Sequence, residues 1–351
     1  MTITDRLYSM INRGLQGNNK GLSLGIPTLD RSIFGLNHKE LYLLAADSGS
    51  GKSSFALYSF VFRPLFDHLE DKDIWILYFS FEMSSEILFA KLLSLYIYEV
   101  YGVIITYEQI LSLRYPLTDE GLEYVNKAKE WLEKVEERIA VIDTPLSSDQ
   151  IEVALRQFTE QFGRYEKISD TDERYIPNNP EQYIICICDH LGLINANPIK
   201  IGIDETTKSF IHYRNIANIT GVLVQQLNRN FKAVDRKLNG MEMIQLNDFS
   251  DSSGPVQGAE VVLALYDPYR EKQSTCKGYD IKELKDRARI IQVLKHRFGK
   301  SNFIVGSGFY GEIGKFIELP KPEDLADYNQ YKHLSGKRLD YNKNVDNNEI
   351  R

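Results

Sequence analysis

One short segment, DSGSGKSS at residues 47–54, has the composition and spacing of a loop that binds phosphate groups. Ala46 and, after four residues, the triplet Gly-Lys-Ser at 51–53 match this pattern, with alanine where glycine is more common. The apolar run ELYLLAA precedes the segment and FALYSFVF follows it, so we expect a strand to enter the loop and a helix to leave it. The residues predicted to bind the phosphates are Ser48, Gly49, Ser50, Gly51, Lys52, Ser53 and Ser54.

Each part of this loop has a chemical task in nucleotide binding. Glycines let backbone N–H groups turn toward the phosphates, and the helix that follows presents its positive end to them. Lys52 can reach the terminal phosphates, and the Ser53 hydroxyl is a suitable ligand for Mg²⁺. The segment therefore predicts a site for a nucleoside triphosphate with Mg²⁺.

Two carboxylates follow apolar runs that are typical of buried strands. Glu82 follows DIWILYFSF, and Asp189 ends the run QYIICICD. In open α/β sheets the carboxyl ends of parallel strands face the ligand crevice. There a glutamate can orient and deprotonate an attacking water, and an aspartate can hold the magnesium shell. Taken alone, however, the SFEMS context of Glu82 favours a solvated glutamate at the start of a helix.

The elements that position these residues alternate along the chain. Segments rich in β-branched and aromatic residues are separated by stretches of helical period, which predicts an α/β fold with a mostly parallel central sheet flanked by helices. Helices are expected at residues 84–101 and 118–138, and Ser147 with Gln150 forms a capping box for another. The predicted strands are ELYLLAA, DIWILYFSFE, RIAVIDTP, QYIICICDH, TGVLVQQL, EVVLALYD and ARIIQVLKHR.

The composition indicates a globular protein whose contacts with nucleic acid are local. Its 351 residues are 43% hydrophobic and carry a net charge of −7, which argues against a surface coated with nucleic-acid-binding groups. No run of about 18 apolar residues and no signal-peptide pattern occurs, so the expected location is the cytoplasm, or the host cytoplasm for a viral protein. Cys186, Cys188 and Cys276 are predicted to be free core thiols.

The order of the motifs resembles that of DnaB-like replicative DNA helicases, members of superfamily 4 with a RecA-type ATPase domain. The similar segments are GIPTLDRSIFGLNHKELYLLAADSGSGKSS, LYFSFEMSSE, Asp-His-Leu at 189–191, TGVLVQQLNR and Lys-His-Arg at 295–297. The resemblance covers residues 21–320 and implies a RecA-like three-layer fold. It also implies a ring hexamer that hydrolyses ATP with Mg²⁺, translocates on single-stranded DNA 5′ to 3′ and unwinds duplex.

The resemblance also assigns roles to individual side chains. Glu82 becomes the catalytic carboxylate, and Asp189 the aspartate that is usual in the Walker B segment. Gln226 would sense the γ-phosphate, with Gln225 as the alternative because a shift of one residue moves a side chain to the other face of a strand. Lys295 and Arg297 would reach into the ATP site of the neighbouring subunit, where the arginine acts as a finger.

The expected DNA contacts combine a departure from the family pattern with a basic loop. DnaB-like helicases usually carry an arginine in a D-L-R-E-S-G stretch, whereas Asp251 is at that position here. The preceding loop, NRNFKAVDRKLNG, offers four cations that would face the channel and bind phosphates, although a solvated basic loop is the alternative. The residues predicted to bind DNA are Arg229, Lys232, Arg236, Lys237, Ser253 and Gly254.

The chain is expected to divide into three parts. Residues 1–20 form a short helix and a linker, 21–320 the motor domain with a polar insertion at about 163–182, and 321–351 a weakly ordered tail. Because only about twenty residues precede the motor, the chain resembles collar-less, phage-type members of the family. Hexamer formation would then rest on the motor domains, with the N-terminal helix docking onto a neighbour.

Other functions stay open at this level. A RecA-type ATPase could use ATP as an assembly or recombination switch without processive unwinding, and the loss of the usual arginine at Asp251 keeps this alternative open. A degenerate nucleotide-binding subunit is disfavoured because every charged part of the site is present. A primase or a helicase loader is the further partner that the resemblance suggests.

Overall fold

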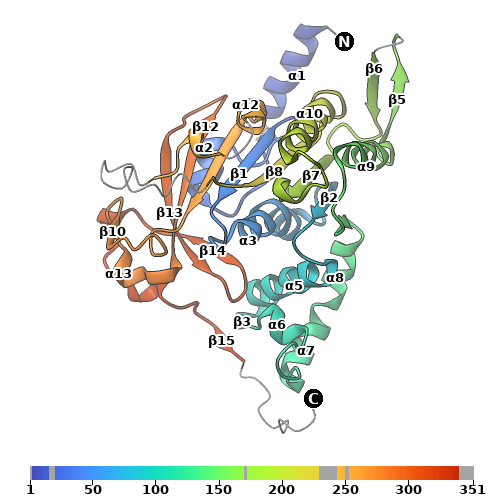
Figure 1. Ribbon diagram of the computed structural model, residues 1–351. Helices are drawn as coiled ribbons and strands as arrows, with labels where there is room; N and C mark the ends of the chain where they lie inside the picture. Colours follow the sequence, from blue (N-terminus) through green and yellow to red (C-terminus); the bar gives the residue numbers. More distant parts are fainter. Residues whose placement is uncertain (1, 16–19, 170–171, 229–242, 250–252, 340–351) are drawn as a thin grey trace.

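The computed structural model describes residues 2–15, 20–169, 172–228, 243–249 and 253–339. Its main feature, within these residues, is a nine-stranded sheet in the order β14-β13-β12-β9-β1-β8-β7-β2-β4 (Figure 1). The strands from β9 to β4 in this order run parallel, whereas β12, β13 and β14 join by antiparallel pairings. The bounds are β1 Leu41–Ala46, β2 Ile74–Ser80, β4 Ile139–Ile142, β7 Tyr183–Asp189, β8 Thr220–Gln226, β9 Val261–Tyr266, β12 Ala288–His296, β13 Phe303–Tyr310 and β14 Lys315–Glu318.

The strands predicted from the sequence are all present, and the prediction of a mostly parallel α/β sheet is confirmed. β1, β7 and β9 are buried along their whole length. A parallel strand covered by helices on both faces has no solvated side, which explains why these segments are continuous apolar runs rather than alternating ones.

Helices cover both faces of the sheet and make three layers. On one face α9 (Ser148–Glu160) and α10 (Ile199–Ala217) pack against Leu43 and Cys186. On the other face α3 (Lys52–Leu57), α4 (Arg63–His68) and α5 (Ser85–Tyr101) pack against Tyr42 and Ile185. Neighbouring residues of one strand thus belong to opposite cores, as the alternation of side chains along a strand requires. The other α-helices in the described part of the chain are α1 Ile3–Leu15, α2 Pro27–Ile33, α6 Tyr107–Ile110, α7 Asp119–Lys127, α8 Lys129–Glu136, α12 Gly254–Gly258 and α13 Ile281–Leu284.

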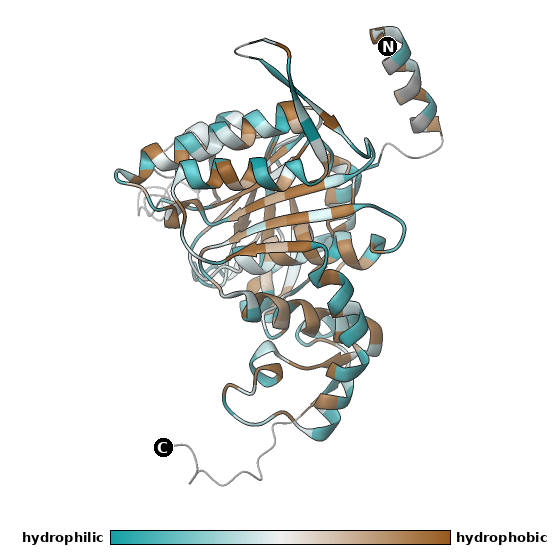
Figure 2. Cartoon of the chain, turned by 90° about the vertical axis from the view of Figure 1, so that its right-hand side faces the viewer, coloured by the Kyte–Doolittle hydropathy of each residue, from teal (hydrophilic) through white to brown (hydrophobic). Residues whose placement is uncertain are grey.

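The expected helix signals are also present. Ser147 Oγ accepts from the backbone N–H of Gln150, and the Gln150 side chain accepts from the backbone N–H of Ser147, so the predicted capping box starts α9. The predicted N-terminal helix is α1, which stands apart from the sheet in Figure 2 and exposes large apolar side chains. Those side chains are Ile3, Leu7, Tyr8, Met10, Ile11 and Leu15.

The tail differs from the expectation of weak order as far as Leu339. β15 (Lys337–Arg338) pairs in parallel with β3 (Val103–Ile104), and the Gln109 side chain donates to the Leu339 carbonyl at 3.0 Å. Leu325 and Leu334 are buried as well, so apolar anchors spaced along a polar segment hold it against the protein. Residues 340–351 lie outside the described part of the chain.

The polar insertion contains regular structure that its composition did not reveal. β5 (Gly163–Lys167) and β6 (Glu173–Pro177) form an antiparallel hairpin, visible at the edge of Figure 1. Tyr165 and Tyr175 pack against the core beside α9 and α10, which fixes the base of the hairpin. A second, shorter hairpin joins β10 (Thr275–Cys276) to β11 (Tyr279–Asp280).

The cysteines are free and buried, as the sequence predicted. Burial raises the pKa of the Cys186 and Cys188 thiols, so both stay protonated in the core. Within the described residues, no helix combines the length and the apolar character needed to cross a bilayer.

Candidate active site

The phosphate-binding loop connects the end of β1 to the start of α3, as the motif requires. Gly49 and Gly51 have φ angles of 74° and 97°, a region that side chains with a Cβ rarely adopt. A Cβ added at Gly51 would also lie 3.1 Å from the Phe309 ring. Gly51 caps α3, and its carbonyl accepts from the Phe55 N–H at 2.8 Å. The loop therefore depends on glycine at both positions, and its backbone leads directly into the N-terminal end of a helix.

Two carboxylates converge on the first turn of α3. The Ser53 hydroxyl donates to Asp189 Oδ1 at 3.2 Å and lies 3.4 Å from Glu82 Oε2. Lys52 Nζ lies 3.7 Å from the same glutamate oxygen. β2 and β7 pair with Ser80 opposite Asp189, so both carboxylates leave the sheet at its carboxyl edge. The structure thus brings together four residues that were predicted from separate parts of the sequence.

Lys52 and Glu82 differ in exposure in a way that suits their predicted roles. The side chain of Lys52 is 7% exposed, whereas that of Glu82 is 50% exposed. A water molecule can therefore reach Glu82. Ser53, Glu82 and Asp189 present oxygen atoms only, which is the ligand class that Mg²⁺ prefers, so these residues fit the metal.

Asp189 is the most enclosed group of the site. Burial raises the pKa of its carboxyl group, and the nearby Lys52 ammonium and the hydrogen bond from Ser53 oppose that rise. Its second oxygen, Oδ2, accepts a 3.0 Å hydrogen bond from the phenol of Tyr78 on β2. Tyr78 is itself fully buried, so the phenol fixes the carboxylate with Oδ1 toward Ser53. The sequence reasoning missed Tyr78, whose only signal was a hydroxyl inside an otherwise apolar strand.

His190, next to Asp189, caps a short turn. Its Nδ1 accepts from the backbone N–H of Gly192 at 3.1 Å, which places the ring proton on Nε2. Burial lowers the pKa of His190 to about 4, so the ring is neutral near pH 7.

Gln225 and Gln226 lie at the carboxyl end of β8, and the structure separates them by face. Gln225 is buried on the face of Leu223, whereas Gln226 is partly exposed on the face of Val224. The helix α3 packs on this second face, and Gln226 pairs in register with Ala46, the residue that enters the phosphate loop. This arrangement favours Gln226 over Gln225 as the residue near the phosphates.

Lys295 and Arg297 lie at the amino ends of the parallel strands, whereas the phosphate loop lies at their carboxyl ends. β12 runs antiparallel to β9, so its last residues reach the amino ends of the parallel strands. The backbone N–H of Arg297 donates to the backbone carbonyl of Glu260. The backbone N–H of Glu260 in turn donates to the carbonyl of Leu41, the first residue of β1. From Leu41 to Ala46 a strand extends about 16 Å at roughly 3.3 Å per residue, so Arg297 is remote from the loop of its own chain.

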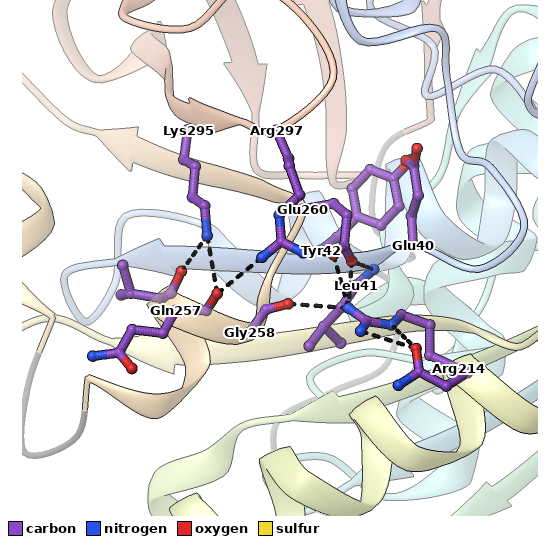
Figure 3. Close-up of polar contacts among 11 residues, drawn as sticks. Glu40, Leu41, Tyr42, Arg214, Gln257, Gly258, Glu260, Lys295 and Arg297 are labelled. Carbon is purple, nitrogen blue, oxygen red and sulfur yellow. Dashed lines mark hydrogen bonds and ion pairs between the residues drawn. The ribbon is translucent and has the colours of Figure 1, made fainter.

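Both side chains are held at those amino ends by contacts drawn in Figure 3. Lys295 Nζ donates to the backbone carbonyls of Val256 and Gln257 at 2.8 and 3.1 Å. Arg297 Nη1 pairs with Glu260 at 2.9 Å, and Nη2 donates to the Gln257 carbonyl at 3.2 Å. Burial lowers the pKa of Lys295, and the Arg297 charge acts in the same direction.

The predicted DNA-binding residues are described only in part. Ser253 and Gly254 lie at the start of α12, where the Gln257 amide donates to Ser253 Oγ at 3.2 Å. The basic loop leaves the carboxyl end of β8, the same edge of the sheet as the phosphate loop. Its cations lie outside the described residues, as does Asp251; they are Arg229, Lys232, Arg236 and Lys237.

Comparison with known families identifies the domain. The family of the DnaB-like helicase C terminal domain matches residues 21–318. The chain belongs to this DnaB-like helicase family. Curated relatives include replicative DNA helicase DnaB of Rickettsia prowazekii (strain Madrid E), 35% identical over 104 residues, which cover 27% of this chain and 21% of the relative. DnaB of Rickettsia typhi (strain ATCC VR-144 / Wilmington) is 34% identical over 104 residues, 27% of this chain and 20% of the relative. The match thus spans about a fifth of the length of these DnaB proteins.

Solved structures agree with the DnaB-like fold. One of them, a separate ATPase domain, superimposes with a TM-score of 0.68 at 20% identity, covering 91% of this chain and 99% of that domain. A DnaB-like replicative helicase, solved in a study of its interactions with primase, gives a TM-score of 0.66 at 20% identity and covers 91% and 67%. The resemblance predicted from the motifs and the RecA-like fold class are therefore confirmed.

Proposed function

We propose that this chain is the ATP-driven motor of a replicative DNA helicase. The observation that carries the proposal is the convergence of Lys52, Ser53, Glu82 and Asp189 at the carboxyl ends of the parallel strands. A lysine and a serine at a helix start can bind phosphates, and the carboxylates can serve metal and water. Membership in the DnaB-like family supports ATP as the nucleotide and DNA as the track.

The residues of the site divide the work of hydrolysis. Bound Mg²⁺, held through Ser53 and Asp189, would neutralise charge on the phosphate oxygens. Lys52 binds the terminal phosphates, and the exposed Glu82 orients a water molecule and accepts its proton. Gln226, which pairs with Ala46 beside the loop, contacts the γ-phosphate, so the release of that phosphate changes the contacts at the end of β8. The loop residues 48–54 supply the backbone N–H groups that surround the phosphates.

Lys295 and Arg297 act on the ATP site of a neighbouring copy. Their position about 16 Å from their own phosphate loop along the strands, and the exposure of the Arg297 side chain, support this assignment. An arginine placed at the transferred phosphoryl group stabilises the charge that develops there. We therefore propose a homohexameric ring in which each ATP site is completed by the next subunit, with α1 docking on a neighbour through its exposed apolar side chains.

The DNA strand is proposed to pass over the loop after β8. Its cations, with Ser253 and Gly254, would bind phosphates without reading sequence. β8 ends beside the phosphate loop and leads into this basic segment, so a change at Gln226 can reach the segment through a few residues of backbone. Translocation 5′ to 3′, a primase or loader as further partner, and action in the cytoplasm complete the proposal.

Strand displacement on forked duplexes tests this function. Forks with a 5′ or a 3′ single-stranded tail are incubated with the chain and ATP, and in parallel with a non-hydrolysable analogue. We expect displacement only with ATP and only on the 5′-tailed fork. ATP hydrolysis stimulated by single strands without displacement on either fork would instead support the ATPase that acts as an assembly or recombination switch.

A further inference from the structure

A buried arginine, distinct from the proposed finger, contacts the phosphate loop of its own chain. Arg289, near the start of β12, is 5% exposed. Its Nε donates to the Ser50 carbonyl at 2.7 Å, and its Nη2 lies 3.1 Å from the carboxylate of Asp267. Nη1 donates to the carbonyls of Asp286 and Ala288 at 2.8 and 2.7 Å. Each nitrogen of the guanidinium therefore has an acceptor, and one acceptor belongs to the loop.

The contact with Ser50 sets the orientation of a peptide group. In a trans peptide the carbonyl and the following N–H point in opposite directions. Because Arg289 holds the Ser50 carbonyl on the sheet side, the N–H of Gly51 is turned the other way, into the loop. Backbone N–H groups that converge on the loop interior are what such a loop offers to phosphates.

A second arginine acts on the loop in the same manner. Arg270, in the segment after β9, donates through its guanidinium to the Ser48 carbonyl, which turns the N–H of Gly49 in the opposite direction. The backbone N–H of Arg270 donates to Asp267 Oδ1 at 3.0 Å. Asp267 thus connects the two arginines, one through an ion pair and the other through a backbone hydrogen bond.

We propose that Arg289, Arg270 and Asp267 are positioning residues that preset the phosphate loop for the β-phosphate of the nucleotide. The inference rests on the proposed function, because it assigns these residues a task in nucleotide binding. A preset loop lowers the cost of binding, since its peptide groups need not reorient when the phosphates arrive. The two arginines do so by holding alternate carbonyls, at Ser48 and Ser50.

Lysine cannot replace Arg289 in this arrangement. The guanidinium is a planar fork that reaches three backbone carbonyls and a carboxylate at once, whereas an ammonium is a point charge without that geometry. Arg289→Lys therefore keeps the charge opposite Asp267 but loses the directed bond to Ser50. A matched control is Arg287→Lys, because the Arg287 guanidinium pairs with Glu312 and donates to the Lys332 carbonyl, away from the phosphate loop.

Nucleotide titration of the full chain tests the proposal. The affinities for ADP and AMP are measured by calorimetry for the wild type, Arg289→Lys, Arg270→Gln and Arg287→Lys. We expect ADP binding to weaken about tenfold or more in the first two variants, while AMP binding and the ADP affinity of Arg287→Lys stay within about twofold of wild type. Arg270 is exposed, so Arg270→Gln should fold normally and keeps the test decisive if Arg289→Lys fails to fold.

The outcomes separate this proposal from the proposed function. A wild-type chain that does not bind ADP would overturn the proposed function and the inference together. A wild type that binds ADP, with both loop variants binding it equally well, would overturn the inference alone. Equal losses in Arg287→Lys and Arg289→Lys would also overturn it, because they would mean a general effect on the fold.

Discussion

Arg297 and Glu260 form an ion pair in which Nη1 lies 2.9 Å from Oε1. Glu260 is buried and also pairs with Arg214 at 2.6 Å, while its Oε2 accepts from the Leu41 N–H (Figure 3). The Arg297 side chain is 44% exposed and that of Arg214 only 11%. Arg297 can therefore leave Glu260 for the proposed phosphate contact on another subunit, because Arg214 still neutralises the buried carboxylate.

Two substitutions in the ATP site should fail in different ways. Lys52→Ala removes the positive charge proposed to contact phosphate, so nucleotide affinity should fall by about 10- to 100-fold or more. Glu82→Gln should bind ATP normally but lower kcat by about 10²- to 10⁴-fold, because only the group proposed to accept the water proton is lost. Nucleotide binding and steady-state ATPase assays measure the two effects. Near-normal turnover by Glu82→Gln would show that another carboxylate activates the water.

Arg297 should act across a subunit interface. Arg297→Ala and Glu82→Gln should each be nearly inactive, with a loss of about 10³- to 10⁵-fold expected for an arginine finger. When the two are mixed, some interfaces join an intact Glu82 to an intact Arg297, so ATPase activity should return in part. If Arg297 served its own chain, no mixed interface would be complete.

The mixing experiment needs proof that subunits exchange. Fluorescence transfer between labelled copies measures that exchange directly, because a ring that never opens would also give no activity. If subunits exchange but the mixture shows no ATPase activity, action of Arg297 in trans is refuted. If subunits exchange and ATPase activity returns, the ring is supported.

Tyr78→Phe should impair the use of magnesium with little effect on ATP affinity. The substitution removes the hydroxyl group that donates to Asp189 Oδ2. Loss of a hydrogen bond that orients a metal ligand typically weakens metal affinity about 10- to 100-fold. The apparent KM for Mg²⁺ in the ATPase assay measures the effect. Tyr42→Phe is the matched control, because Tyr42 is equally buried but its hydroxyl bonds to the Gly35 carbonyl. A similar rise in both variants would assign Tyr78 a purely structural role.

Charge reversal in the loop after β8 should weaken DNA binding without affecting basal ATPase. In Lys232→Glu with Arg236→Glu, the slope of log affinity against log salt should fall by about 0.7 for each single-strand phosphate that the protein no longer binds. Lys127→Glu with Lys129→Glu changes the net charge equally at exposed positions on α7 and α8 and should leave the slope unchanged. An unaltered slope in the loop variant would exclude the loop as the segment that binds the DNA phosphates.

The sequence predicted the sheet well because burial on both faces gives each central strand an unbroken apolar run. It predicted Lys52, Ser53, Glu82 and Asp189 because they follow such runs or fit a fixed spacing, and the structure brings them together. The choice between Gln225 and Gln226 could not be made before the strand had defined faces.

Contacts between segments distant in sequence were not predictable in the same way. Arg289 and Tyr78 are polar residues within apolar strands, and their roles depend on which loop or carboxylate the fold places beside them. The hairpin at 163–177 and the segment up to Leu339 were missed for a related reason. Their polar composition indicated a surface insertion and a weakly ordered tail, whereas a few tyrosines and leucines anchor both segments to the core.

Arg297 and the phosphate loop lie at opposite ends of the strands, and this limits how copies of the chain can assemble. A contact that brings Arg297 to the loop of a neighbour joins two different surfaces, so the interface is heterologous and each added copy leaves both surfaces free at the ends. The assembly ends only when the rotation per step closes, at about 60° for six copies. Substitutions that tilt this interface should therefore yield other ring sizes or open helical filaments, rather than separate monomers.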